Sequence, residues 1–467
     1  MYKLKTNPWS HQWKALDYTM THPVAGIFTD MGSGKTKIMI DTIVNRDFGL
    51  VLIVGTKKSC DVWEEEIKVH SDISPELIFN LCEMSSVSKT TFLTEKFGRG
   101  QKYSPRGVFI VNYESVWREP FSKLILKTKF DCIICDESHK LKSPSGKASR
   151  FLARLTKKVP CRYILSGTPT SESPLDIYGQ YRFLSPDVFG TNYGDFKAQY
   201  ENVDIQKTAF AGYTVLDNKE PYKNLDVLKE KIYSCAFYIE SRVELPETFH
   251  IYIEAPLSKK AQEIYKELNK EGVYEDEDGV LETNNVLSKQ TRLQQLLSGY
   301  LNLETENFTK TELVKKDNSK EESFQEIVEN ISFDEKIVVF AKYRKDFESI
   351  EAVCKKLKRK YGEISGVRDD YSDWKKNKID VIAVQYDSGA ESISLVEAKY
   401  CVYYSHTFSY GKYSQSVKRT HRPGQNRCVI YYHMISKVKG IKTVDEKIRE
   451  ALEQKKSFMD YIMEQEG

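Results

Sequence analysis

The chain has 467 residues, 40% of them hydrophobic and 29% charged, and its formal net charge is only +3. This composition is typical of a multi-domain globular protein and excludes a histone-like polycation, so we expect any nucleic-acid site to be a local basic surface. No apolar run approaches the roughly 20 residues that span a bilayer, and the first five residues (MYKLK) do not resemble a signal peptide. We therefore expect a soluble protein without a membrane partner.

Residues 30–36 (DMGSGKT) form the first stretch along the chain that carries chemistry. Apolar residues 26–28 predict a short buried strand before it, and residues 37–44 predict a packed helix after it. The backbone N–H groups of a Gly-rich loop between a strand and a helix can surround phosphate oxygens. We therefore predict an ATP site in which Lys35 reaches the β- and γ-phosphates and the Thr36 hydroxyl holds Mg²⁺. The other predicted phosphate-binding residues are Gly32, Ser33 and Gly34.

The loop departs from the common pattern in one place. Thr29 stands where the first Gly of G-x-x-x-x-G-K-[ST] usually falls. A Gly-rich turn that merely caps a helix is the alternative interpretation. The acidic residues farther along the chain favour the phosphate loop.

Two acidic residues follow the apolar stretch at residues 130–135, which predicts a strand. They are Asp136 and Glu137, and they lie at the carboxyl edge, where ligands bind in open α/β sheets. Successive side chains point in different directions, so we expect the two acids to act differently. Asp136 is predicted to coordinate Mg²⁺, directly or through water, and Glu137 to orient and deprotonate the attacking water.

The nine cysteines are scattered, and Cys132 and Cys135 form the only Cys-x-x-Cys pair. Their odd separation on a strand places the side chains on opposite faces, and no second pair supplies zinc ligands. We interpret them as buried packing residues in a reducing cytoplasm.

A basic segment near the C-terminus has the form of a short helix stopped by Pro-Gly, at residues 415–425 (QSVKRTHRPGQ). Arg419 and Arg422 are three residues apart, which places them on one helical face. Two guanidinium groups projected together suit a triphosphate whose charge rises in the transition state. We therefore predict that both arginines are catalytic, together with Lys35, Asp136 and Glu137.

With these motifs in this order, the chain resembles an SNF2-type (Swi2/Snf2-like) ATPase of the superfamily 2 DEAD/DEAH helicases, in a compact bacterial or phage-like form. The resemblance runs from about Pro8 to about Ile448. Residues 136–139 (DESH) are similar to DEAH, residues 165–169 (LSGTP) match motif III, and residues 421–425 (HRPGQ) have the SNF2-like ending. This resemblance implies that Gln12 reads adenine and that Gly389 and Gln415 also bind ATP. It also implies that the motif III residues couple the ATP state to lobe movement. These coupling residues are Ser166, Gly167 and Thr168.

Weaker matches extend the resemblance along the chain. Residues 54–67 resemble motif Ia, residues 111–114 motif Ib, residues 336–341 motif IV and residues 388–395 motif V. Three residues depart from the family pattern. Ser392 and Ser394 replace the usual Gly and Asn of motif V, and Lys418 replaces a Gly before the first arginine.

A basic cluster directly after the acidic motif is the predicted DNA surface. A loop at residues 143–146 (SPSG) lies within it, and the SNF2 resemblance gives this loop a place beside the nucleic-acid track. The predicted DNA-binding residues are Lys140, Lys142, Lys147 and Arg150. A second cluster at residues 355–360 is more typical of the solvated end of a helix.

The predicted fold class is α/β, with two RecA-like parallel-sheet lobes and a helical insertion. Lobe 1 is expected at residues 1–238 and lobe 2 at residues 239–467, with the insertion at about residues 258–301 and an exposed acidic loop at residues 275–279. In lobe 2, strands are expected near Ile337, at residues 381–384 and at residues 400–404.

The resemblance implies a DNA-dependent ATPase, a hydrolase that uses ATP and Mg²⁺, translocates on duplex DNA, and remodels or displaces bound proteins. Phage or bacterial DNA replication, recombination or repair in the cytoplasm is the expected setting, with a protein partner for targeting. Two alternatives remain open. One is a strand-separating DNA or RNA helicase of the same superfamily, and the other is an interaction protein that ATP switches without motor activity.

Overall fold

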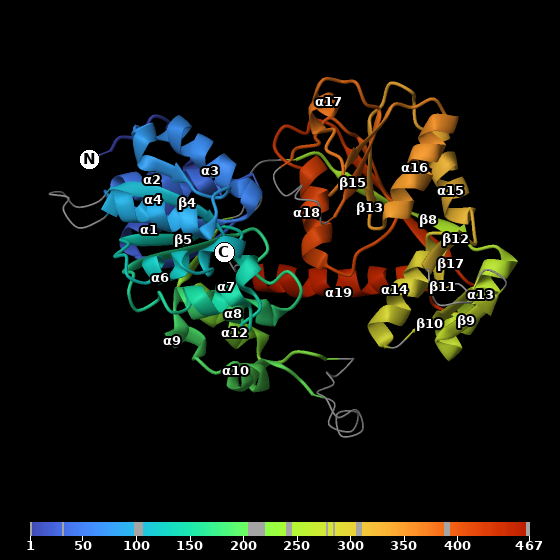
Figure 1. The fold of residues 1–467 in the computed structure, drawn as a ribbon, viewed down its shortest axis with the longest axis horizontal. Coiled ribbons are helices and arrows are strands. Elements are labelled where there is room, and N and C mark those ends of the chain that lie inside the picture. The colour runs from blue at the N-terminus through green and yellow to red at the C-terminus, as the bar shows by residue number, and fades with distance from the viewer. Residues whose placement is uncertain are drawn as a thin grey trace. The chain divides into compact units, whose positions relative to one another are not determined.

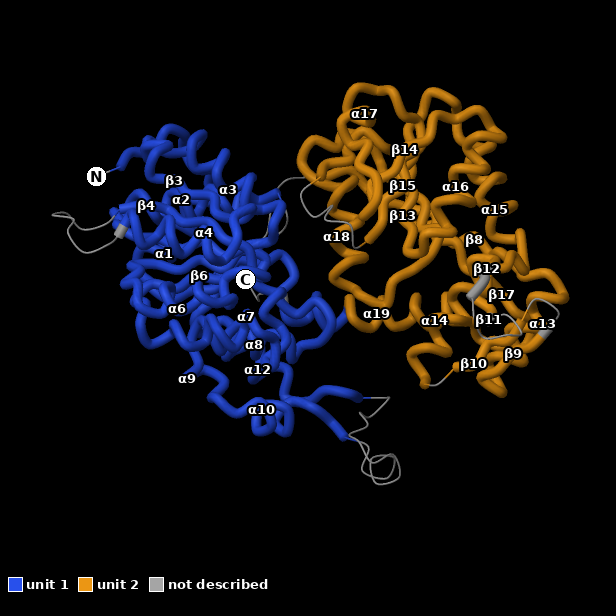
Figure 2. Tube along the Cα trace, in the orientation of Figure 1, with its two compact units in different colours: residues 1–242, 457–467 blue, residues 243–456 orange. Residues whose placement is uncertain are grey.

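The computed structural model describes residues 2–29, 32–97, 106–203, 220–239, 245–276, 279–283, 285–304, 311–386 and 393–463. The chain divides into two compact units (Figure 2). Unit 1 comprises residues 1–242 together with 457–467, and unit 2 comprises residues 243–456.

Unit 1 is built on a seven-stranded sheet in the order β3-β4-β2-β5-β6-β1-β7, in which every neighbouring pair is parallel. Most of these strands are continuous apolar runs, as expected where helices cover both faces of a parallel sheet. The strands are β1 (Val24–Thr29), β2 (Leu50–Gly55), β3 (Ile78–Asn80), β4 (Gly107–Asn112), β5 (Cys132–Cys135), β6 (Cys161–Ser166) and β7 (Ala236–Ile239).

Helices connect these strands and cover the sheet (Figure 1). The longer ones are α1 (Ser10–Thr21), α2 (Lys35–Asn45), α3 (Lys57–His70), α4 (Ser86–Phe97), α8 (Ile177–Leu184), α10 (Tyr193–Tyr200) and α12 (Leu225–Tyr233). The short ones are α5 (Tyr113–Val116), α6 (Phe121–Ile125), α7 (Lys147–Leu152) and α9 (Pro186–Phe189), with 3-10 turns η1 (Pro75–Leu77), η2 (Ser138–Leu141) and η3 (Pro174–Asp176).

Alternate residues of the strands belong to different layers of the unit 1 core. Val51 and Ile53 pack in one cluster with residues of α2 and α3, including Ile38 and Trp63. Leu52 and the other residues of opposite parity are buried outside that cluster. This period of two is the side-chain alternation of a strand, and it gives unit 1 three layers.

Unit 2 contains a six-stranded sheet in the order β14-β15-β13-β16-β17-β8, which is also parallel at every pairing. Its strands are β8 (Thr248–Pro256), β13 (Ile337–Ala341), β14 (Tyr361–Ile364), β15 (Val381–Gln385), β16 (Tyr400–Tyr403) and β17 (Val429–Lys437). The helices around it are α15 (Ser319–Glu329), α16 (Arg344–Lys356), α17 (Tyr371–Lys375) and α18 (Tyr410–Thr420). The two parallel sheets confirm the predicted α/β class, and β13, β15 and β16 confirm the three strands predicted for lobe 2.

The predicted helical insertion contains strands as well as helices. Two helices are present, α13 (Lys259–Glu271) and α14 (Val286–Leu297), but an antiparallel four-stranded sheet accompanies them. Its strands are β9 (Val273–Asp276), β10 (Gly279–Glu282), β11 (Tyr300–Glu304) and β12 (Thr311–Lys315). The strands are short and rich in polar residues, so their pairing with one another, rather than an apolar run, defines them. The expectation of an acidic loop at residues 275–279 was wrong at both ends, because Glu275 and Asp276 belong to β9 and Gly279 begins β10, which pairs with it. Residues 277–278 lie outside the described residues.

The last helix, α19 (Val444–Met463), begins in unit 2 and ends in unit 1. In unit 1 its final turns are held by side chains from the region of α12. The Tyr233 hydroxyl donates a hydrogen bond to Ile462 O at 3.1 Å, the Tyr461 hydroxyl donates one to Asp226, and Phe458 packs edge-on against Tyr222. No described helix is both long and apolar enough to cross a membrane.

Cys132 and Cys135 are fully buried, which confirms that they are packing residues. Burial raises the pKa of both thiols well above the ordinary value. The structure also contains a disulfide that the sequence did not indicate, between Cys60 on α3 and Cys82 after β3. Scattered cysteines carry no pairing signal, and this pair is close only because α3 packs beside β3.

Candidate active site

The phosphate loop connects β1 to α2 and requires glycine at two positions. Gly32 and Gly34 have φ angles of 82° and 83°, in the left-handed region that favours glycine. A Cβ atom at Gly34 would also lie 2.1 Å from the Gln12 side-chain nitrogen. Gly34 occupies the N-cap position of α2, so the loop turns directly into the helix. Backbone N–H groups at such a helix start are suited to binding phosphate oxygens.

Gln12 supports this loop from α1. Its Oε1 accepts a hydrogen bond from the Trp9 backbone N–H at 2.9 Å, and its Nε2 donates to Ser33 O at 3.1 Å. The His11 Nε2 lies 2.8 Å from the same carbonyl. The predicted adenine-reading residue therefore also fixes the position of the phosphate loop. Trp9, at the N-cap of α1, and Trp13, within that helix, are 54% and 53% exposed, and no sequence motif assigned these two indoles a role.

Lys35 and Thr36 open α2. The Lys35 ammonium is buried, and it donates a hydrogen bond to Thr29 O at the end of β1 at 3.1 Å. The Thr29 hydroxyl in turn bonds the hydroxyl of Ser33, so the residue that replaces the usual Gly connects the two ends of the loop. Thr36 is partly exposed in the first turn of α2.

Asp136 follows β5 at the carboxyl edge of the same sheet, and side chains from α3 and α5 hold it together with the adjacent backbone N–H. Its Oδ2 accepts a hydrogen bond from the Trp63 indole at 2.9 Å, and its Oδ1 accepts one from the Glu137 N–H at 2.9 Å. The Tyr113 hydroxyl donates to Asp136 O at 2.6 Å. Trp63 and Tyr113 lie in the stretches that resemble motifs Ia and Ib, but the sequence did not indicate that they contact Asp136, because an aromatic residue on a helix is usually a packing residue.

The backbone of Glu137 has a φ of 47°, in the left-handed region, which is uncommon for a residue with a Cβ. A strained conformation of this kind persists only where the surrounding structure holds it, and such residues cluster at active sites. Here the backbone contacts of Asp136 and the 3-10 turn η2 hold it on either side. The strain is consistent with a functional position for the carboxyl group.

The pKa values of the two acids are shifted in opposite directions. Burial and then the charge of Glu137 raise the pKa of Asp136. Burial also acts to raise the pKa of Glu137, but His139, whose Nδ1 lies 3.3 Å from Glu137 Oε2, outweighs it together with the charges of Lys35 and Lys140, so the net pKa is lowered. Glu137 is therefore ionised near neutral pH, as a general base must be.

The residues of this edge fit a magnesium-bound triphosphate. Two buried carboxyl groups repel each other, and a divalent cation at Asp136 would relieve that repulsion. Among the described residues, no group of three or more His, Cys, Asp or Glu could hold a metal ion by itself. A Mg²⁺ ion would therefore take ligands from the phosphates and water as well as from Asp136 and Thr36.

The motif III residues lie on the adjacent strand β6 and the loop after it. Ser166 and Thr168 are fully buried, and the Ser166 hydroxyl accepts a hydrogen bond from the Thr168 N–H at 3.1 Å. Gln180 of α8 joins this loop to the acidic turn. Its amide nitrogen donates to Pro169 O at 2.6 Å, and its amide oxygen accepts from the Ser138 hydroxyl at 2.7 Å. No sequence motif indicated this bridge.

The arginine motif lies in unit 2, where α18 carries Gln415 and Arg419, both buried. The helix ends at Thr420, so Arg422 follows it and does not share a helical face with Arg419 as predicted. Pro423 disfavours helical conformation in the residue before it, which explains the early end. Gln425 holds the following turn by donating to Val396 O at 2.9 Å and Ala398 O at 3.1 Å.

The four predicted DNA-binding residues occupy different environments in unit 1. Lys140 is exposed at the end of the acidic motif, where its charge acts on Glu137. Lys142 lies 3.8 Å from the Glu172 carboxylate. Lys147 and Arg150 are exposed on α7.

Asp30 and Met31 of the phosphate loop, and Gly389 with residues 388–392 of the motif V match, lie outside the described residues.

Comparison with known proteins gives the family. A protein family described as SNF2-related domain matches residues 3–312, and one described as helicase conserved C-terminal domain matches residues 319–424. The chain is 22% identical to the yeast ISWI chromatin-remodeling complex ATPase ISW1, covering 95% of this chain and 39% of that protein. It is 21% identical to a RAD54-like DNA repair and recombination protein of Drosophila ananassae, covering 93% and 59%.

Two further similarities come from microorganisms. An uncharacterized ATP-dependent helicase of Mycoplasma pneumoniae is 23% identical, covering 93% of this chain and 40% of that protein. The Sulfolobus solfataricus SWI2/SNF2 ATPase core in complex with dsDNA matches with a TM-score of 0.42 and 19% identity, covering 99% of this chain and 94% of that one. The chain spans less than two thirds of the length of these three curated relatives.

Proposed function

Because the chain belongs to the SNF2-related family, we propose that it is a DNA-dependent ATPase that translocates on duplex DNA and remodels or displaces bound proteins. The observation that carries the ATPase proposal is the position of Lys35, Asp136 and Glu137 at one edge of the sheet: the Lys35 ammonium is hydrogen-bonded to Thr29 O at the end of β1, and the two acids follow β5. The charge of Lys35 acts on both acids. A phosphate-loop lysine and two acids of unequal proton affinity thus lie within electrostatic reach at one sheet edge. That is the arrangement that hydrolysis of a nucleoside triphosphate requires.

In this proposal the residues of unit 1 have distinct roles. The backbone of residues 32–36 and the Lys35 ammonium bind the phosphates, Thr36 and Asp136 hold Mg²⁺, and Gln12 reads the adenine. Bound Mg²⁺ supplies charge neutralisation at the phosphates. The Glu137 carboxylate orients the attacking water and accepts its proton, and His139 maintains Glu137 in the ionised form.

Arg419 and Arg422 of unit 2 complete the site when the two lobes close, and Gln415 contributes to nucleotide binding. Lobe 1 extends to about residue 238 in this scheme, and the Ser166–Thr168 loop transmits nucleotide state to lobe movement. An arginine finger is worth roughly a thousandfold or more in rate, or about 4 kcal/mol. Arg419→Ala and Arg422→Ala should each abolish DNA-stimulated turnover and leave ATP binding largely intact. Normal turnover in both variants would refute the two-lobe mechanism.

The exposed side chains after the acidic motif, Lys140, Lys142, Lys147 and Arg150, are the proposed DNA contacts. We place the activity in bacterial or phage DNA replication, recombination or repair, in the cytoplasm of the cell or host, where ATP and duplex DNA occur together. The relatives named for chromatin remodeling and for DNA repair support a DNA-directed role.

The decisive experiment compares ATPase rates with duplex DNA, single-stranded DNA and RNA, and measures displacement of a triplex-forming strand. Stimulation by duplex DNA, together with triplex displacement and no unwinding of a forked duplex, is the expected result. Efficient fork unwinding or stimulation mainly by RNA would favour the helicase alternative. Slow hydrolysis that no nucleic acid stimulates would favour the ATP-switched interaction protein.

A further inference from the structure

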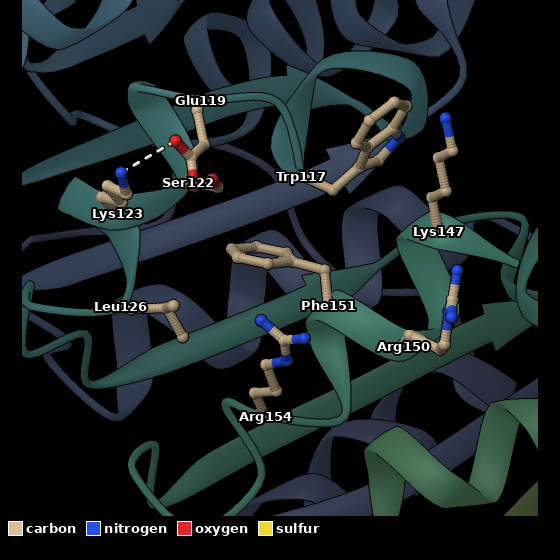
Figure 3. A pocket seen from close by; sticks show the side chains of 9 residues that line it. All are labelled: Trp117, Glu119, Ser122, Lys123, Leu126, Lys147, Arg150, Phe151 and Arg154. Carbon is tan, nitrogen blue, oxygen red and sulfur yellow. Dashed lines mark ion pairs between the residues drawn. The ribbon is translucent and has the colours of Figure 1, made fainter.

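Unit 1 has a pocket of about 290 Å³ between α6 and α7 (Figure 3). Trp117 and Glu119 come from the segment before α6, and Leu126 follows that helix. Phe151 projects from α7 into the middle of the view, and Arg154 extends from the turn after α7. The remaining lining residues are Ser122, Lys123, Lys147 and Arg150.

The pocket extends away from the proposed catalytic edge. Asp136 lies beyond the carboxyl end of β5, whereas Leu126 and Arg154 lie on the segments that lead to the amino ends of β5 and β6. A hydrogen bond from the Lys158 ammonium to Leu126 O, at 3.1 Å, joins these two segments. The ligand of this pocket therefore need not be a substrate of the ATPase.

The charge of the pocket is strongly positive. Four cationic side chains line it against one carboxylate, Glu119, which already pairs with Lys123 at 2.8 Å. Lys147, Arg150 and Arg154 are exposed, and within the described chain none of the three forms an ion pair or a side-chain hydrogen bond. Lys147 lies over the Trp117 ring at 4.6 Å. An anionic ligand would supply the carboxylate or phosphate partners that the two guanidinium groups lack.

The floor of the pocket is apolar, which distinguishes between anionic ligands. Phe151 is 5% exposed, and Leu126 and Trp117 are partly exposed beside it. The backbone of duplex DNA presents phosphates and sugars but no large apolar group to place over such a floor, because its bases are stacked inside the helix. A peptide can insert one apolar side chain and pair its neighbouring carboxylates with the arginines.

We propose that this pocket docks an acidic segment of a protein partner, with one large apolar side chain over Phe151 and carboxylates on Arg150 and Arg154. Such docking gives the proposed motor the targeting partner that its function needs, and it rests on contacts that ATP hydrolysis does not use. Lys147 and Arg150 also belong to the proposed DNA surface, so Arg154 is the residue that separates the two ligands.

The test uses the full chain and a fluorescein-labelled heptapeptide with Phe at its centre and Glu or Asp elsewhere. A second peptide has Ser in place of Phe and the same charge. Fluorescence anisotropy should show saturable binding of the Phe peptide at micromolar concentration and weaker binding of the Ser peptide. Arg154→Glu should weaken Phe-peptide binding about tenfold or more, because it places a carboxylate against the ligand's carboxylates. Arg154→Lys, which keeps the charge, should retain most of it.

Lys157→Glu is the matched control, since it reverses a charge at an exposed position three residues on and outside the pocket. It should leave peptide binding unchanged, and both Glu variants should keep DNA-stimulated ATPase activity. Failure of the wild type to bind, equal affinity for the two peptides, or equal loss in both Glu variants would overturn the proposal. If Arg154→Glu weakens duplex DNA binding as much as peptide binding, the pocket belongs to the DNA surface instead. Absence of DNA-stimulated ATPase activity in the wild type would refute the proposed function without affecting the peptide result.

Discussion

A single substitution at Gln180 should lower both the free energy of unfolding and the stimulation of ATP hydrolysis by DNA. Its side chain is fully buried and makes three hydrogen bonds. The amide nitrogen donates to Pro169 O at 2.6 Å and to Asp176 O at 3.0 Å, and the amide oxygen accepts from Ser138 Oγ at 2.7 Å. Gln180 therefore links the turn that carries Asp136 and Glu137 to the loop that follows Ser166.

Gln180→Leu keeps similar bulk but removes every one of these bonds. Each net hydrogen bond contributes about 1 kcal/mol, and each buried polar group left without a partner costs roughly 1–3 kcal/mol. Asp176 O also lies in a helical turn, so the largest losses are at Ser138 and Pro169. We expect the free energy of unfolding to fall by roughly 3 kcal/mol, and that of Ser138→Ala by about 1 kcal/mol. The double variant should lose less than the sum, because the two residues share one bond.

Thermal unfolding of the full chain, followed together with ATPase rates with and without duplex DNA, measures both effects. Basal hydrolysis should persist in Gln180→Leu, whereas DNA stimulation should fall, because the acidic turn and the motif III loop no longer move together. Gln199→Leu, an exposed substitution on α10, is the matched control. A Gln180→Leu melting temperature equal to that of the control, or strictly additive effects in the double variant, would refute the reasoning.

Three further predictions test the site and the core. Lys35→Ala should lose ATP binding and hydrolysis, whereas Glu137→Gln should bind ATP and lose turnover; wild-type turnover in the latter would exclude Glu137 as the base. Alanine at any two of Lys140, Lys142, Lys147 and Arg150 should weaken binding to all DNA sequences and reduce the salt slope by about one to two, while DNA-independent ATPase survives; an unchanged slope places the DNA elsewhere. Burial lowers the pKa values of His250, His406 and His433 below the ordinary value of 6.5. The unfolded chain therefore binds more protons than the folded chain below that pH, and the melting temperature should fall as the pH drops from about 7 to 5. His433→Phe should flatten this pH dependence, and a melting temperature independent of pH would contradict it.

The sequence alone determined the parts of this protein that depend on neighbouring residues. The phosphate loop is contiguous, so the sequence alone identified its glycines, Lys35 and Thr36. The apolar runs of β5, β13, β15 and β16 predicted buried parallel strands. Asp136 and Glu137 could be placed because they follow such a run. These features are specified within a few residues, and their conformational preferences are local.

Only the tertiary structure decided what depends on distant segments. Trp63 and Tyr113 reach Asp136, and Gln180 joins two motifs, because helices separated in sequence pack on one sheet. The insertion formed an antiparallel sheet because its short polar strands pair with one another, a preference that no single strand reveals. The pocket at Arg154 likewise exists because residues of α6 and α7, together with residues that precede or follow those helices, line one cavity. Each of these features depends on contacts between residues far apart in the sequence, and local sequence patterns do not specify such contacts.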